Sequence, residues 1–426
     1  ASGDHDAYRH VVYPKITVHV RQWTPIDRSE PFGYVDQEGR YSAVISKPWL
    51  IRDYLTEQLT RLTNNYLCDL YVGQSDERIP PEYIRGITQI PQDRGDIPRP
   101  TLDAVHDGIV DGAWKAFHGK EKPLFHFGAQ RFDIACARIE HYTGIEVDTV
   151  QKYILFTNYA MHTTEFVKFG LRELAREDSR YTALVLPTGE TIHPNDAVLL
   201  DVDELTLTSR YQMPRFDLIT AGGDGITMIN IGVGPSNAKT ITDCLAVLRP
   251  EAWIMIGHCA GLDGRMRIGD LILGNAYQRE DHILDGTVTT SNPIPAIPEI
   301  QRMLEAAVDE VYGKDNSLMR TGTVLSTDDR NWEWRTSRDL WEWLRHAAVG
   351  LRSPSACRAQ ASRPSAGLLF QFEGGTRDVR GARGGGFGGK SGAAAHPQIA
   401  PNGRRGTVSL RLMIRLREMH NLAKET

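Results

Sequence analysis

The stretch that decides the fold runs from residue 226 to residue 256 and reads ITMINIGVGPSNAKTITDCLAVLRPEAWIMI. An apolar strand pattern over 227–231 leads into a glycine loop, a helical pattern follows over 236–248, and a second strand pattern covers 253–256. A strand, a helix and a strand within roughly thirty residues have the size of one βαβ unit. The sequence therefore predicts an α/β fold with parallel strands.

The loop Gly232-Val233-Gly234-Pro235 is the first candidate binding element. Glycine permits a tight turn and a close approach of the backbone to a ligand, and proline suits the first helical turn. The helix that follows offers free N–H groups and a partial positive charge. We therefore expect Gly232, Gly234, Ser236 and Asn237 to contact a substrate, with a turn that binds no ligand as the alternative.

A second candidate loop, GHCAG (257–261), directly follows the strand at 253–256. Open α/β sheets bind ligands beyond the carboxyl ends of their strands. We expect substrate contacts from His258, Cys259, Ala260 and Gly261, with a local turn as the alternative. No His and Asn arrangement marks Cys259 as an activated nucleophile.

Three further polar clusters have a structural explanation that we weigh more heavily than a functional one. The cluster Arg279-Glu280-Asp281-His282 is typical of a solvated strand end. His162, Glu165 and Lys168 lie on one helical face and are typical of a surface set of salt bridges. Asp328, Asp329, Arg330 and Asn331 form either a ligand loop or a helix cap. The His and carboxylate residues lack a metal-ligand spacing such as His-Glu-x-x-His, so no metal site is predicted.

Upstream and downstream patterns extend this fold. The first third reads as an α+β unit, with a strand at 11–20, a possible partner strand at 39–45, and helices at 48–65 and 132–142. Further elements are expected as a helix through 162–169, a strand at 181–186, a hairpin of 217–220 with 226–231, a strand at 268–276 and an amphipathic helix at 298–312.

Composition and charge exclude several classes of protein. The 426 residues are 41% hydrophobic and carry a net charge of −5, so no global basic field attracts nucleic acid. No window approaches the roughly 18 apolar residues of a membrane span, and the polar start is unlike a secretory leader. Five widely spaced cysteines predict neither a disulfide framework nor a Cys-x-x-Cys zinc site. We expect a cytoplasmic protein without nucleic-acid or membrane partners.

Nearly all of residues 10–345 resembles the AMP nucleosidase family. The segments that carry the resemblance are MINIGVGPSNAKT (228–240), LRPEAWIMIGHCAGLDG (248–264), RIGDLILGNAYQREDHILDG (267–286), SNPIPAIPEIQ (291–301), RTGTVLSTDDRNWEWR (320–335), VVYPKITV (11–18), LTEQLTRL (55–62), ARIEHYTG (137–144) and ILFTNY (154–159). GVGPSNAKT and DDRNWE are specific strings, and finding both in order by chance is improbable.

The resemblance implies a three-layer, nucleoside-phosphorylase-like catalytic domain preceded by an N-terminal α+β domain of regulatory type. It places these domains at residues 176–346 and 1–175. It implies hydrolysis of the N-glycosidic bond of AMP to adenine and ribose 5-phosphate in purine catabolism and salvage. It also implies a homo-oligomer, typically a hexamer, that Mg-ATP activates and phosphate inhibits, with no cofactor required for the chemistry.

One difference from the related phosphorylases favours water as the nucleophile. Phosphorylases of the bacterial hexameric kind carry an Arg and a Ser around the glycine that aligns with Gly257. Met255 and His258 occupy those places here. Without this Arg, the site lacks the guanidinium group that binds phosphate strongly through two parallel hydrogen bonds.

The resemblance ends near residue 347. The family continues with an Asp-Met-Glu-Ser strand, whose Glu binds the ribose hydroxyls, and with a Ser-Asp-Lys-Pro string, whose Asp is the proposed N7 acid; neither string occurs here. Residues 351–426 instead hold 13 Lys and Arg against 4 Asp and Glu, and 381–392 (GARGGGFGGKSG) contain seven glycines. We expect 347–426 to be disordered or encoded out of frame. We assign no catalytic role to Glu373 or Asp378.

Two alternatives to AMP hydrolysis follow. The absent motifs favour a non-catalytic nucleotide-binding or regulatory homologue. A nucleosidase or phosphorylase for unphosphorylated purine nucleosides is the second alternative, although those enzymes lack the N-terminal domain.

Overall fold

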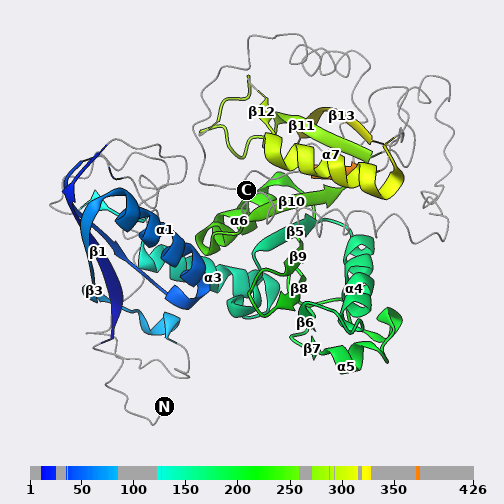
Figure 1. Ribbon diagram of the computed structural model, residues 1–426. Coiled ribbons are helices and arrows are strands. Elements are labelled where there is room, and N and C mark those ends of the chain that lie inside the picture. Colours follow the sequence, from blue (N-terminus) through cyan, green and yellow to red (C-terminus); the bar gives the residue numbers. More distant parts are fainter. Residues whose placement is uncertain are drawn as a thin grey trace.

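The computed structural model describes residues 11–24, 35, 37–84, 122–125, 127–258, 271–286, 288–291, 293–314, 319–327 and 371–374, the last of these by its backbone alone. Within these residues the strands form a four-stranded sheet and a ten-stranded sheet (Figure 1). None of the helices there is long and apolar enough to cross a membrane.

The four-stranded sheet lies in the N-terminal unit. Its central strand β1 (Val12–Gln22) pairs antiparallel with β2 (Gly39–Val44) and with β3 (Leu67–Arg78), and β2 pairs with β4 (Lys122–Pro123). The 3-10 turn η2 (Pro48–Ile51) leads into helix α1 (Arg52–Asn65). These elements confirm the predicted strand pair and helix. Strand β3 was missed because most of its side chains are exposed, so no buried face shows as an apolar alternation.

The ten-stranded sheet has the order β12-β11-β14-β10-β5-β9-β8-β6-β7, with β13 paired to β11. Its parallel centre contains β10 (Ala252–Gly257), β5 (Tyr153–Thr157) and β9 (Ile226–Asn230). The remaining strands are β6 (Tyr181–Val185), β7 (Thr191–Ile192), β8 (Arg215–Thr220), β11 (Leu271–Glu280), β12 (Ile294–Pro295), β13 (Met319–Thr327) and β14 (Gln371–Gly374). The predicted hairpin is confirmed as the antiparallel pair of β8 and β9.

The predicted strand–helix–strand unit is present, but its two strands are not neighbours. Helix α6 (Pro235–Leu245) continues into the 3-10 turn η8 (Ala246–Leu248) and connects β9 to β10. Strand β5 lies between them and pairs in parallel with both. All five residues of β5 are buried, as expected for a central strand covered on both faces.

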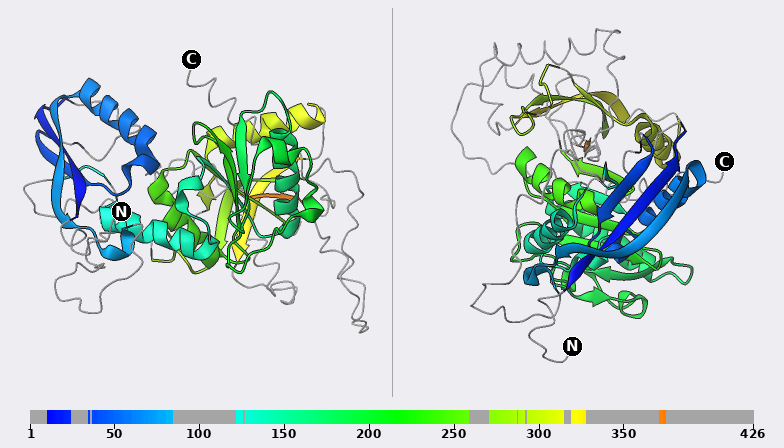
Figure 2. Two further views of the ribbon diagram at one scale, coloured as in Figure 1. Left: turned by 90° about the horizontal axis from the view of Figure 1, so that it is seen from below. Right: turned by 90° about the vertical axis from the view of Figure 1, so that its left-hand side faces the viewer.

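Helices cover both faces of this sheet and give the expected layered arrangement (Figure 2). Helix α3 (Ala129–Thr143) packs with α6 in the core that takes Ile154 and Phe156 from β5. Helices α4 (Ala160–Leu174) and α7 (Pro298–Tyr312) contribute to the second core, which takes Tyr153 and Leu155. The shorter helical pieces are α5 (Pro194–Ala197), η3 (Pro81–Tyr83), η6 (Val147–Thr149) and η7 (Val202–Glu204).

The large sheet takes strands from both sides of the expected domain boundary at residue 175. Strand β5 and helix α4 precede that residue and belong to the ten-stranded sheet and its second core. One continuous apolar core also runs from β1 and α1 through α3 to β5 and β10. The resemblance implies a boundary at residue 175, whereas parallel pairing brings β5 into the centre of the later strands.

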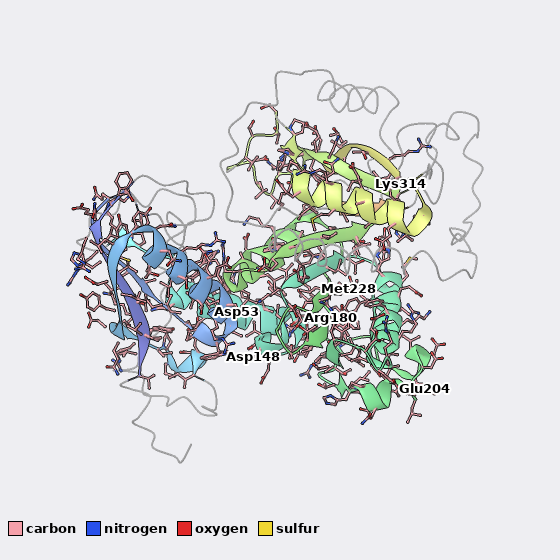
Figure 3. The ribbon with its side chains drawn as sticks, viewed as in Figure 1. Asp53, Asp148, Arg180, Glu204, Met228 and Lys314 are labelled. Carbon is pink, nitrogen blue, oxygen red and sulfur yellow. The ribbon has the colours of Figure 1, made fainter. Side chains whose placement is uncertain are left out.

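Polar contacts join the N-terminal unit to the larger one. Trp49 donates its indole N–H to Asp148 at 2.9 Å, and Lys152 donates to Asp53 at 2.8 Å. Both carboxylates are labelled at this junction in Figure 3. The guanidinium of Arg249 lies over the ring of Tyr54 at 4.8 Å.

The segment 347–426 contributes one described strand. Strand β14 pairs parallel with β10 and antiparallel with β11, so it fills a position between them. The sequence predicted that 347–426 would be disordered or encoded out of frame, and the strand at Gln371–Gly374 differs from the expected disorder for those four residues. The rest of 347–426 lies outside the described residues.

Candidate functional site

The candidate site lies where three parallel strands end. Thr157, the last residue of β5, is in register with Asn230 of β9 on one side and with Ile256 of β10 on the other. The chain segments that follow these strands therefore leave the sheet at the same edge. This is the edge at which open α/β sheets hold their ligands.

The glycine loop has the backbone that its sequence predicted. Gly232 and Gly234 have φ values of 67° and 116°, a region that L side chains rarely adopt. The side chain of Asn230 accepts the N–H of Gly232 at 3.1 Å and fixes the turn. Pro235 then begins α6, with Asn237 half-buried and Ser236 exposed in its first turn.

His258 directly follows β10 and meets two residues that the sequence did not assign to the site. The ring centroid of Tyr159 lies 4.2 Å from that of His258, and the ring of His162 lies 5.3 Å from it. Tyr159 precedes α4 and His162 is in its first turn. The three rings form a group that we call the His–Tyr cluster.

Thr157 anchors the cluster to the sheet. Its hydroxyl lies 2.7 Å from Nδ1 of His162 and accepts the N–H of Tyr159 at 3.2 Å. Burial, together with the nearby His258, lowers the pKa of His162 to about 4. Burial also lowers the pKa of His258. Both imidazoles are therefore neutral near pH 7.

Asn158, the residue after the last residue of β5, carries an unused hydrogen-bond acceptor. Its side-chain oxygen is buried and has no partner among the described residues. A buried acceptor without a partner is costly, and one explanation is a ligand that donates to it. The residue lies between Thr157 and Tyr159, at the edge where β5 ends.

The other predicted site residues have mixed outcomes. Cys259, Ala260, Gly261, Asp328, Asp329, Arg330 and Asn331 lie outside the described residues. Met255, the expected replacement for a phosphate-binding Arg, is buried in the first core. The predicted pair of Glu165 and Lys168 is present at 3.0 Å, but His162 turns to Thr157 and His258 instead.

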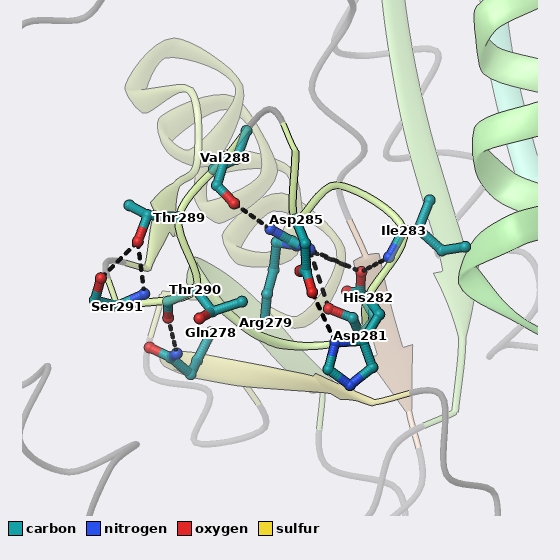
Figure 4. A network of polar contacts seen from close by, with 10 residues as sticks. All are labelled: Gln278, Arg279, Asp281, His282, Ile283, Asp285, Val288, Thr289, Thr290 and Ser291. Carbon is teal, nitrogen blue, oxygen red and sulfur yellow. Dashed lines mark hydrogen bonds and ion pairs between the residues drawn. The ribbon is translucent and has the colours of Figure 1, made fainter.

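The polar cluster at the end of β11 is a hydrogen-bonded network around the buried Arg279 and Asp281, and only its outer member His282 is solvated as the sequence predicted (Figure 4). Arg279 is 3% exposed and donates to Asp281, to Asp285 at 2.8 Å and to the carbonyl of Val288 at 2.7 Å. The hydrogen bond from His282 is the main cause that lowers the pKa of Asp285. A buried guanidinium explains the acidic residues around it. The sequence alone did not show that the arginine turns inward.

The fold and the position of the site define a class: an α/β protein with its site beyond the ends of parallel strands. The model of the Phosphorylase superfamily matches residues 201–350, and the model of the Bacterial AMP nucleoside phosphorylase N-terminus matches residues 1–121. AMP nucleosidase of Escherichia coli (strain K12) is 41% identical over 366 residues, which cover 81% of this chain and 73% of that protein. The chain belongs to the AMP nucleosidase family.

Two solved structures of named enzymes match this chain at low identity. The AMP nucleosidase from Bacteroides thetaiotaomicron VPI-5482 is 19% identical, with a TM-score of 0.44, and the match covers 68% of this chain and 98% of that one. The purine nucleoside phosphorylase from Toxoplasma gondii in complex with immucillin-H is 13% identical, with a TM-score of 0.41. The match covers 66% of this chain and 95% of that one.

Proposed function

We propose that this protein is an N-glycosyl hydrolase that converts AMP and water into adenine and ribose 5-phosphate. The observation that carries the proposal is the 41% identity, over most of both chains, to a protein named AMP nucleosidase. The site supports it, because a glycine loop, a helix N-terminus and neutral imidazoles meet at the edge of the sheet where ligands of such folds bind.

The reaction sets clear chemical needs. Cleavage passes through an oxocarbenium-like ribose, and adenine leaves well only when an acid protonates it. A water molecule must approach the ribose from the opposite face. The replacement of the phosphate-binding Arg by the buried Met255 supports water as the nucleophile over phosphate.

Release of adenine from AMP tests the proposal directly. Purified protein is incubated with AMP and Mg-ATP in phosphate-free buffer, and the products are separated by chromatography. Adenine and ribose 5-phosphate in equal amounts support hydrolysis. AMP binding without adenine supports the non-catalytic alternative, and cleavage of adenosine but not AMP supports the unphosphorylated-nucleoside alternative.

We also propose Mg-ATP as an activator, phosphate as an inhibitor and a homo-oligomer, with a hexamer as the expected size. The continuous core between the N-terminal unit and the large sheet supports communication between an effector and the site. Initial rates with and without each effector, and sedimentation equilibrium for the mass of the assembly, test these points.

A further inference from the structure

The His–Tyr cluster contains two histidines from distant parts of the chain at one strand edge. His162 belongs to the helix that follows β5, and His258 follows the neighbouring parallel strand β10. Tyr159 lies against both, with ring centroids 4.2 Å from His258 and 5.8 Å from His162. Side chains that meet in this way at the ligand edge of an α/β sheet are candidates for chemistry.

The hydrogen bonds of Thr157 give the two imidazoles different roles. Its hydroxyl accepts the N–H of Tyr159, and we assign its own proton to the contact with Nδ1 of His162, because the described residues offer that proton no other acceptor. With Nδ1 as an acceptor, the proton of neutral His162 lies on Nε2. His162 is then a fixed hydrogen-bond donor, and His258 is the imidazole that remains free to accept a proton.

The charge state of the pair distinguishes a water site from an anion site. The pKa of each ring is lowered by burial, and that of His162 also by His258. Neither ring has an ion pair with a carboxylate in the part of the chain that the structure describes. Two neutral imidazoles hold a phosphate ion poorly, because the strong phosphate sites in proteins use Arg or Lys. They suit a neutral water molecule well.

We propose that His258 accepts the proton of the attacking water and that His162, held by Thr157, is the positioning residue for that step. The inference rests on the proposed hydrolysis of AMP. The water oxygen bonds to C1′ as the C1′–N9 bond breaks, and one water proton passes to His258. The bonding electrons leave with adenine, which takes one proton from solvent. His258 returns the proton of the attacking water to solvent, so the step balances.

Two variants separate the roles. His258→Gln keeps a polar side chain but removes the proton acceptor, and we expect kcat to fall by about 10²–10⁴-fold with little change in KM for AMP. His162→Asn keeps an acceptor near the position of Nδ1 for Thr157 and removes Nε2. We expect a smaller loss of kcat and a change in the pH profile, because the base then lacks its positioned partner. His141→Gln, an exposed change on α3, is the control.

Competition between methanol and water measures how the site holds the nucleophile. This property would stay unchanged if the two histidines had only a structural role. Attack by methanol gives methyl ribose 5-phosphate, so the product ratio reports how tightly the nucleophile is held. Both site variants should raise the methyl product share above that of wild type and of His141→Gln, with unfolding curves checked for each protein. Wild-type kcat or an unchanged product ratio in folded His258→Gln overturns the inference. Wild-type protein that releases no adenine overturns the proposed function, and this inference falls with it.

Discussion

The phenol of Tyr13 donates a 2.6 Å hydrogen bond to the carboxylate of Asp133, although the two residues are far apart in the sequence. Tyr13 lies on β1 of the four-stranded sheet, and Asp133 lies on α3, which packs against the large sheet. Ser46 donates to the other carboxylate oxygen at 2.6 Å, and Lys47 also contacts it. Asp133 therefore joins the two parts of the molecule through three donors.

Removal of Asp133 should destabilise this junction strongly. We expect Asp133→Ala to lower the free energy of unfolding by about 3–5 kcal/mol, because the variant leaves Lys47 and two buried hydroxyls without their acceptor. Urea unfolding measures the change. Asp69→Ala, which breaks the exposed pair with Arg21, is the matched control and should unfold like wild type. Equal urea midpoints for Asp133→Ala and Asp69→Ala would contradict the role of Asp133 in stabilising the junction.

The buried pair of Arg215 and Asp217 gives a second stability prediction. Both side chains are fully buried and the guanidinium Nε lies 3.0 Å from the carboxylate. Arg215→Met should cost about 3–5 kcal/mol, because an unpaired carboxylate remains in the core. The double variant Arg215→Met with Asp217→Leu should recover part of that loss in the same unfolding assay. A double variant as unstable as the single one would show that packing and the hydrogen bonds of Thr149 and Thr227 to Asp217, not the charge pair, dominate.

The glycine loop should tolerate no side chain at Gly234. Its φ of 116° and ψ of 147° lie in a region that is nearly exclusive to glycine, so Gly234→Ala should cost about 1–3 kcal/mol. Displacement of the loop should also raise KM for AMP. Gly73→Ala is the control, since this strand residue has no positive φ and its added Cβ meets open space. Thermal unfolding and AMP kinetics give the two readouts.

The low pKa of His162 predicts an acid-dependent loss of stability. Its folded pKa of about 4 lies below the ordinary value of 6.5, so the unfolded chain binds more protons between these values. Stability from this residue is complete above pH 6.5 and falls as the pH drops toward 4, by an amount on the order of 3 kcal/mol.

Comparison of wild type with His162→Asn separates the pH-dependent stability contributed by His162 from that of the carboxylates, which titrate in the same pH range. The difference between their free energies of unfolding should change between pH 6.5 and pH 4 and stay constant above pH 7. A difference independent of pH across that range would show that the ring is not held in its neutral form.

Local sequence patterns predicted much of the fold. The apolar repeat of 298–312 and the alternation at 11–20 required only that helices and strands bury particular spacings, and the glycines at 232 and 234 required only a turn that other residues avoid. The family could be recognised for the same reason, because its strings are local. Strand β3 and the inward turn of Arg279 were not predictable in this way, because their environment is set by residues elsewhere.

The sequence by itself determined the α/β class, the glycine loop and the position of His258 at a strand end. Only the tertiary structure decided that β5 lies between β9 and β10, and hence that His162 meets His258. Strand order depends on which apolar faces pack together across long stretches of chain, and periodicity within one segment carries no information about its neighbours. For that reason His162 looks like part of a surface helix in the sequence and lies in the candidate site in the fold.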